Sequence, residues 1–131
     1  MSSKILMVVS SIVMGIAGIA GLFAPAELLA SLGLADIAPA VLVQLLGALY
    51  FAFAITNWTA RHNPIGGIYS RPLALGNFAH FTIGMLVLIR PAIALPRFPL
   101  IFAFVVYLVF ALLFGALLFG QGPVAKTAPQ R

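Results

Sequence analysis

The sequence contains no cysteine. This absence excludes disulfide-stapled scaffolds, thiolate metal sites and thiol nucleophiles. It also excludes the small four-helix membrane oxidoreductases that pass electrons from thiols to quinones, because those proteins need paired cysteines. Any chemistry in this chain must therefore come from other side chains.

Charge is nearly as scarce as cysteine. Charged residues make up 7% of the 131 residues, and only two of them, Glu27 and Asp36, are acidic. A soluble domain carries about 25% charged residues. Hydrophobic residues make up 63% of the chain, more apolar surface than a soluble protein of this size could bury. The composition therefore predicts an integral membrane protein.

Four apolar runs are each long enough to cross a bilayer as a helix, which takes about 20 residues. Pro39, Pro72 and Pro99 stand near the starts of three runs, where a missing N–H costs little. Short linkers favour antiparallel neighbours. We therefore expect residues 1–131 to form a single all-α domain, a transmembrane four-helix bundle of up-down-up-down topology. The expected helices cover about 5–24, 39–60, 72–89 and 99–119, with a short interfacial helix over about 26–33.

The net charge of +5 predicts orientation rather than nucleic-acid binding, because no surface of interleaved basic and aromatic residues is evident. Five basic residues fall on one side of the expected bundle, and two fall on the other side with both acids. The positive-inside rule makes the first side cytoplasmic, so both termini are expected in the cytoplasm. The first set is Lys4, Arg61, Arg71, Lys126 and Arg131, and the second is Arg90 and Arg97.

Small residues should mark the helix contacts, since apolar burial does not drive association in lipid. The first run contains Gly15, Gly18 and Gly21, and the second contains Gly47. We interpret such stripes as packing faces rather than ligand sites. Three prolines between residues 90 and 99 predict a tight, extended loop there.

Polar residues inside the apolar runs are the main indication of function, because each needs a partner or a role in hydrocarbon. Counting 1.5 Å per residue from the helix ends places several of them in the cytoplasmic half. We expect a polar pocket there that opens to the cytoplasm. Its expected lining is Asn57, Asn77 and His80 with Ser11 and Tyr50, its apolar contacts are Phe51 and Phe81, and its mouth is Arg61, His62 and Arg71.

Other interpretations of this cluster stay open. The same side chains could form a hydrogen-bonded network that only joins helices. His80 could also be a haem or metal ligand, although no acid, thiol or second histidine is expected at its depth. Enzymatic chemistry lacks support, because no intramembrane acid would orient His80 and no nucleophile–base pair is evident.

Two stretches carry a resemblance to known proteins: "LLGALYFAFAITNW" (45–58) and "IGGIYSRPLALGNFAHFTIGMLVLI" (65–89), together with Pro-x-x-Leu-Leu at 25–29. Over about residues 5 to 95 the chain resembles a group of small bacterial four-helix inner-membrane proteins, loosely similar to the DoxX-like class. The resemblance implies a bacterial inner membrane but no established activity. The DoxX-like tie implies only general links to redox or membrane-complex roles.

These features together favour a non-enzymatic membrane protein that binds a lipid-like or small amphipathic ligand in the polar pocket, or that serves as an accessory subunit of a membrane complex. A small homodimeric transporter or channel is the alternative, and a haem protein or membrane enzyme based on His80 is the third hypothesis. We expect no resident cofactor or metal and no nucleic-acid partner. The expected partners are membrane lipids, the ligand, and a second copy or a larger complex.

Overall fold

The computed structural model describes residues 3–36, 38–63 and 70–120 of the chain. Within these residues the chain forms five helices and no strand, which confirms the all-α prediction for this part of the protein. The basic residues Lys126 and Arg131 lie outside the described residues. The helices are α1 (Ser3–Phe23), α2 (Pro25–Leu32), α3 (Ala40–Ala60), α4 (Arg71–Ala94) and α5 (Phe98–Phe119).

Four of these helices, α1, α3, α4 and α5, are long and apolar enough to cross a membrane. The shortest have 21 residues, which at 1.5 Å per residue gives about 31 Å, close to the thickness of the hydrocarbon core. Many large apolar side chains stay on the outside of the molecule, including Ile16 at 66% exposure and Ile83 at 61%. This combination indicates a multi-pass membrane protein.

Prolines and one glycine set several helix ends. Pro39 precedes the first residue of α3, and Pro99 lies in the first turn of α5, where no intrahelical N–H bond is lost. Helix α2 ends at Gly33, whose φ of 75° is left-handed. The N–H groups of Gly33 and Leu34 donate to the carbonyls of Ala30 and Leu29, which is the Schellman arrangement.

Helix α4 continues past the predicted end at residue 89 as far as Ala94, through Pro91. The stretch expected to be an extended loop is therefore helical over its first half. Pro91 lies within the last turn of the helix, so it removes one intrahelical hydrogen bond near the end of the ladder. The residues that follow, Ala92 to Ala94, are compatible with another turn, and Leu95 N–H still donates to the Pro91 carbonyl.

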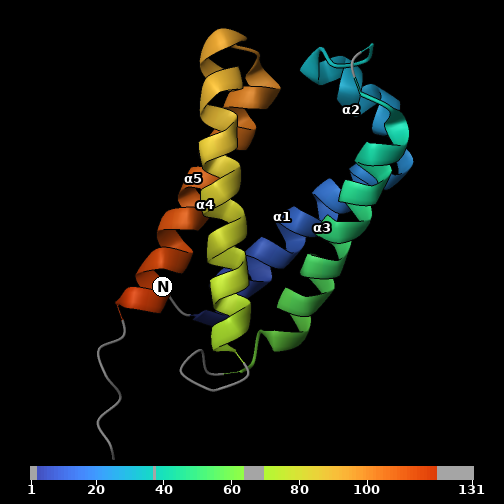
Figure 1. The fold of residues 1–131 in the computed structure, drawn as a ribbon. Helices are drawn as coiled ribbons and strands as arrows, with labels where there is room; N and C mark the ends of the chain where they lie inside the picture. Colours follow the sequence, from blue (N-terminus) through green and yellow to red (C-terminus); the bar gives the residue numbers. More distant parts are fainter. Residues whose placement is uncertain (1–2, 37, 64–69, 121–131) are drawn as a thin grey trace, which may run out of the picture.

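The long helices pack as two pairs, α1 with α3 and α4 with α5 (Figure 1). Glycines bring the members of each pair close together. A Cβ on Gly18 would lie 2.8 Å from the backbone N of Phe51, and one on Gly84 would collide with the ring of Tyr107. Each pair is therefore a closely packed unit.

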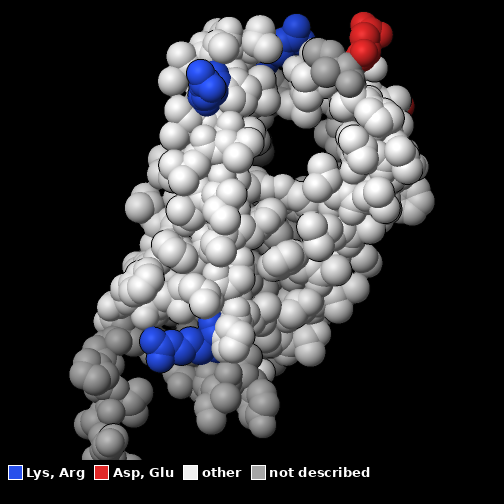
Figure 2. Space-filling model, in the orientation of Figure 1, with Lys and Arg blue, Asp and Glu red and all other residues white. Residues whose placement is uncertain are grey.

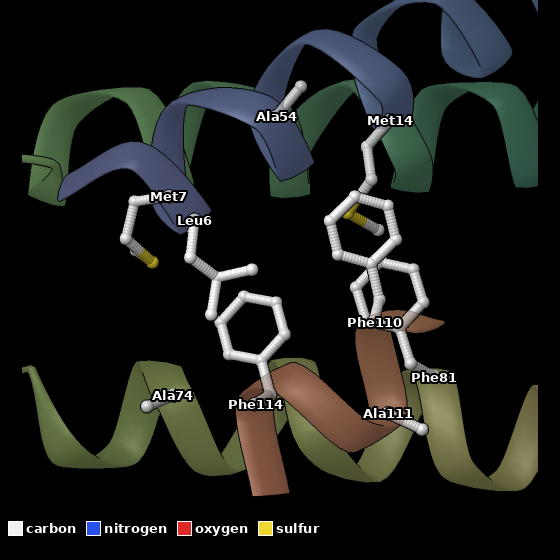
Figure 3. Packing of buried hydrophobic residues seen from close by; sticks show 9 residues of the cluster. All are labelled: Leu6, Met7, Met14, Ala54, Ala74, Phe81, Phe110, Ala111 and Phe114. Atoms are coloured by element: carbon white, nitrogen blue, oxygen red, sulfur yellow. The ribbon is translucent and has the colours of Figure 1, made fainter. Parts of the chain in front are cut away.

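The two pairs meet at one end of the molecule and diverge toward the other (Figure 1). We call the end where α1 and α4 begin the narrow end, and the end that carries α2 the wide end. The buried core lies in the narrow half, where side chains from all four long helices interdigitate (Figure 3). Its members are Leu6, Met7, Met14, Ala54, Ala74, Phe81, Phe110, Ala111 and Phe114.

The wide half is hollowed between the two pairs (Figure 2). At the wide end α2 contacts both α3 and α5. The Arg97 guanidinium, from the residue before α5, packs against Gly33 at the end of α2, where a Cβ would lie 2.8 Å from it. A cation at the C-terminal end of a helix is favourable, and this contact joins the two pairs above the hollow.

Candidate functional site

Asn57 of α3 and Asn77 of α4 form the polar centre of the narrow half. The Asn57 Nδ2 donates to the Asn77 Oδ1 at 2.9 Å, and the Asn77 Nδ2 donates to the Asn57 Oδ1 at 2.7 Å. Both residues have 0% exposure. The structure thus brings together two of the residues that the sequence placed around a pocket, and links the two helix pairs through them.

Further bonds use the remaining hydrogens of these amides. Asn57 also donates to the Ser10 hydroxyl at 3.1 Å, and Asn77 to the carbonyl of Leu73 at 2.9 Å. Ser10 in turn donates to the carbonyl of Met7. Each amide nitrogen carries two hydrogens, so neither has a hydrogen left for a ligand. The arrangement can hold helices together, and it offers no donor to another molecule.

Two other expected pocket residues lie elsewhere. Ser11 is buried on α1, but the hydroxyl that bonds Asn57 belongs to its neighbour Ser10. Phe51 is 39% exposed, and its backbone packs against Gly18. Phe51 therefore belongs to the contact between α1 and α3 and does not line the polar centre.

His80 lies in an aromatic layer between the two pairs. Its ring centroid is 5.3 Å from that of Tyr50, 5.4 Å from that of Phe53 and 5.1 Å from that of Phe81. The Tyr107 Oη is 3.1 Å from the His80 Nε2, and which group donates depends on the tautomer. Phe81 is 1% exposed and stacks on Phe110. The structure thus brings together His80, Tyr50 and Phe81, and it places Phe53 where the sequence favoured Phe51.

Two polar side-chain atoms in this aromatic layer lack a hydrogen-bond partner. In the described part of the chain, neither the His80 Nδ1 nor the Tyr50 hydroxyl has a hydrogen-bond partner. Neither atom is buried, because the only buried side-chain N or O atom without a partner among the described residues is the Thr82 Oγ1. Tyr50 and His80 are both half-buried. This layer therefore presents accessible hydrogen-bonding groups midway along α3 and α4.

The hollow between the two pairs lies in the wide half of the molecule (Figures 1 and 2), and Tyr50 and His80 lie midway along α3 and α4. Leu46 lies one turn from Tyr50 on the same face of α3, toward the wide end, and Val87 lies two turns from His80 on the same face of α4. Their exposures are 54% and 67%. Helices α3 and α4 are not among the helix pairs in close contact, and a hollow is visible between the two pairs in the wide half (Figure 2). We call this hollow the lateral opening.

The residues expected at a pocket mouth lie at the narrow end. Arg61 donates to the Trp58 carbonyl at 2.6 Å, and its guanidinium lies 4.1 Å from the centre of the Trp58 ring. His62 and Arg71 are exposed. These side chains are separated from the lateral opening by the Asn57–Asn77 pair and the core.

Three residues of these clusters were not among the predicted site residues: Ser10, Phe53 and Tyr107. Ser10 and Tyr107 are polar residues inside apolar runs, which is a signal for an intramembrane partner. Nothing in the pattern separates Phe53 from Phe51 until the face of α3 that meets α4 is known. No group of three His, Asp or Glu side chains in residues 3–36, 38–63 and 70–120 is placed to hold a metal ion.

Comparison with known proteins gives no relative. A search of protein-family models, curated protein sequences and solved structures finds no match to this chain.

Proposed function

We propose that this protein binds a lipid-like or small amphipathic ligand inside the membrane, in the lateral opening between its two helix pairs. The observation that carries the proposal is the pair of accessible, unpartnered polar groups, the His80 Nδ1 and the Tyr50 hydroxyl, at the base of that opening. An unsatisfied polar group in hydrocarbon costs several kcal/mol. A ligand that supplies hydrogen bonds there would offset this cost.

The walls of the lateral opening support an amphipathic ligand. Above the aromatic layer the inward positions are Leu46 and Val87, each more than half exposed. Apolar walls over a polar base suit a molecule with one hydrogen-bonding group and an apolar body. The side-chain amide hydrogens of Asn57 and Asn77 are all donated to protein acceptors. We therefore assign the ligand to the lateral opening and a structural role to this pair.

We further propose an up-down-up-down topology in a bacterial inner membrane, with both termini in the cytoplasm. The narrow end, where α1 and α4 begin and α3 ends, would then face the cytoplasm with Lys4, Arg61 and Arg71, and the wide end would face outward with Arg90 and Arg97 (Figure 1). The proposal follows the positive-inside rule. The lateral opening would lie in the outer half of the bilayer.

The binding proposal is tested by filling the opening. Val87→Trp adds bulk at an inward position that is 67% exposed, and Ile16→Trp adds the same bulk on the outer face of α1 at 66% exposure. The proteins are extracted directly from membranes into nanodiscs, and retained small molecules are counted by native mass spectrometry. We expect wild type and Ile16→Trp to retain a defined ligand and Val87→Trp to lose it. Equal retention in all three, or none in any, would overturn the proposal.

A further inference from the structure

We infer that the ligand of the lateral opening is an uncharged lipid with a carbonyl or hydroxyl group, which the His80 Nδ1 and the Tyr50 hydroxyl bind by hydrogen bonds. This inference rests on the proposed function and adds the chemical class of the ligand and its route of access. It follows from three features of the molecule: the distribution of charge, the bonding of the His80 ring, and the contacts at the two ends.

On the face that Figure 2 shows, the Lys, Arg, Asp and Glu side chains of the described residues lie at the two ends of the molecule. The nearest charged residues to His80 on α4 are Arg71 and Arg90, nine and ten residues away, which is about 14 and 15 Å along the axis. On α3 the nearest to Tyr50 is Arg61, about 16 Å away. An anionic or cationic headgroup at this depth would have no counter-charge, which is expensive in hydrocarbon. The ligand group that reaches the aromatic layer must therefore be neutral.

The His80 ring can accept either kind of neutral polar group. When Tyr107 donates to Nε2, a neutral ring carries its hydrogen on Nδ1 and donates to a carbonyl. When Nε2 donates to the Tyr107 oxygen, Nδ1 accepts from a hydroxyl. The Tyr50 hydroxyl can do both. A pure hydrocarbon would leave both groups unsatisfied, so an oxygen-bearing lipid is favoured over it.

The described residues obstruct the path to this site from the narrow end and bridge the two pairs at the wide end. Toward the narrow end stand the Asn57–Asn77 pair and the buried rings of Phe81 and Phe114, which have 1% and 0% exposure. Toward the wide end the Arg97 guanidinium packs against Gly33. The open route is from the side, past Leu46 and Val87, where a bilayer would lie. The ligand therefore comes from the lipid phase.

The test uses nanodiscs doped with dioleoylglycerol, a neutral lipid with ester carbonyls and a hydroxyl. Two comparison probes isolate the chemistry: dioleoylphosphatidic acid has the same chains with a phosphate, and octadecene has no polar group. Binding is titrated by native mass spectrometry. The imidazole nitrogens of ¹⁵N-labelled His80 are followed by NMR in the same samples. We expect dioleoylglycerol to bind and to shift the Nδ1 resonance, and the other two probes to do neither.

Two tyrosines give a matched pair of variants, because the centroids of Tyr50 and Tyr107 both lie 5.3 Å from that of His80. Tyr50→Phe removes an unpartnered hydroxyl and Tyr107→Phe removes a partnered one. Loss of one hydrogen bond to the ligand should weaken dioleoylglycerol binding about 3- to 10-fold in Tyr50→Phe and in His80→Phe. Tyr107→Phe breaks the bond to the His80 Nε2 and should shift the Nε2 resonance, which Tyr50→Phe should leave in place. Ile16→Trp, on the outer face of α1, is the control for binding and should change it less than about 2-fold.

The outcomes separate this inference from the proposed function. If dioleoylglycerol binds, Val87→Trp blocks it, and yet Tyr50→Phe and His80→Phe bind as well as wild type, the opening is a lipid site but the polar recognition is refuted. Tighter binding of phosphatidic acid or of octadecene would also refute it. If no probe binds and no native ligand is retained, the proposed function itself fails.

Discussion

The side chains of Asn57 and Asn77 are bonded to each other twice, with N–O distances of 2.9 and 2.7 Å, in a site with no exposed surface. Each amide satisfies the other across the junction of the two helix pairs. Two hydrogen bonds between the same two side chains set both the relative depth and the relative rotation of α3 and α4. In the narrow half the two helix pairs are therefore held in one arrangement.

Removing one member of this pair should destabilise the protein. Asn77→Leu leaves the Asn57 amide buried without its main partner, which should cost about 1–3 kcal/mol of unfolding free energy. The double variant Asn57→Leu/Asn77→Leu should cost less than the sum of the two single variants, with a coupling of about 0.5–3 kcal/mol. Reversible unfolding in mixed micelles measures all three. Strict additivity would show that the two amides act independently.

The glycines of α1 and α3 should not tolerate a side chain. A Cβ on Gly47 would lie 2.8 Å from the Gly18 carbonyl oxygen and from the Leu22 N, so Gly47→Ala must push the helices apart. We expect a loss of about 1–3 kcal/mol. Gly76→Ala is the control, because nothing lies within 4 Å of its added Cβ, and it should gain up to about 1 kcal/mol of helix propensity. Thermal unfolding followed by circular dichroism compares them, and equal stability of the two variants would contradict the described contact.

Gly84→Ala should disturb the bonding of His80 without touching it. The new Cβ would collide with the Tyr107 ring, and the ring would have to turn away from His80. We expect the Nε2 resonance of ¹⁵N-labelled His80 to shift as its bond to Tyr107 is lost, while Gly76→Ala leaves it in place. An unchanged resonance in Gly84→Ala would mean that Tyr107 can move without releasing the imidazole.

Gly33→Ala should destabilise the protein in two ways, through backbone strain at residue 33 and through collision with Arg97. Gly33→Ala places a Cβ at a residue with φ of 75°, which should cost about 1–2 kcal/mol of backbone strain. It also collides with the guanidinium. In the Arg97→Ala background only the strain remains, so the same change should cost less there. Hydrogen exchange at the amides of α2 measures both effects, and identical penalties in the two backgrounds would remove the proposed link between α2 and α5.

The proposed orientation is directly accessible to labelling, because the chain has no cysteine of its own. His62→Cys and Asp36→Cys each introduce one thiol at an exposed position. In intact bacteria a membrane-impermeant maleimide should label position 36, and it should label position 62 only after the membrane is permeabilised. The opposite pattern would reverse the orientation.

The sequence predicted the helical class and the apolar segments well. A helix that crosses the hydrocarbon of a bilayer needs an apolar run of about 20 residues, and such runs are visible in the sequence. Depth counting also placed Asn57 near Asn77 and Tyr50 near His80, since rise per residue is nearly constant. It could not choose Phe53 over Phe51 or Ser10 over Ser11. Those choices depend on helix rotation, which the close approach of Gly18 and Gly47 determines. The added turn of α4 beyond residue 89 was missed because a proline near a helix end costs only one bond.

The divergence of the two helix pairs has a mechanical consequence for the surrounding bilayer. A molecule that is compact at one end and spread at the other occupies more area in one leaflet than in its counterpart. Lipids packed around such a wedge relax by bending, so many copies in one patch would favour a curved sheet. A lipid seated between the pairs would belong to the wedge and would preserve its taper.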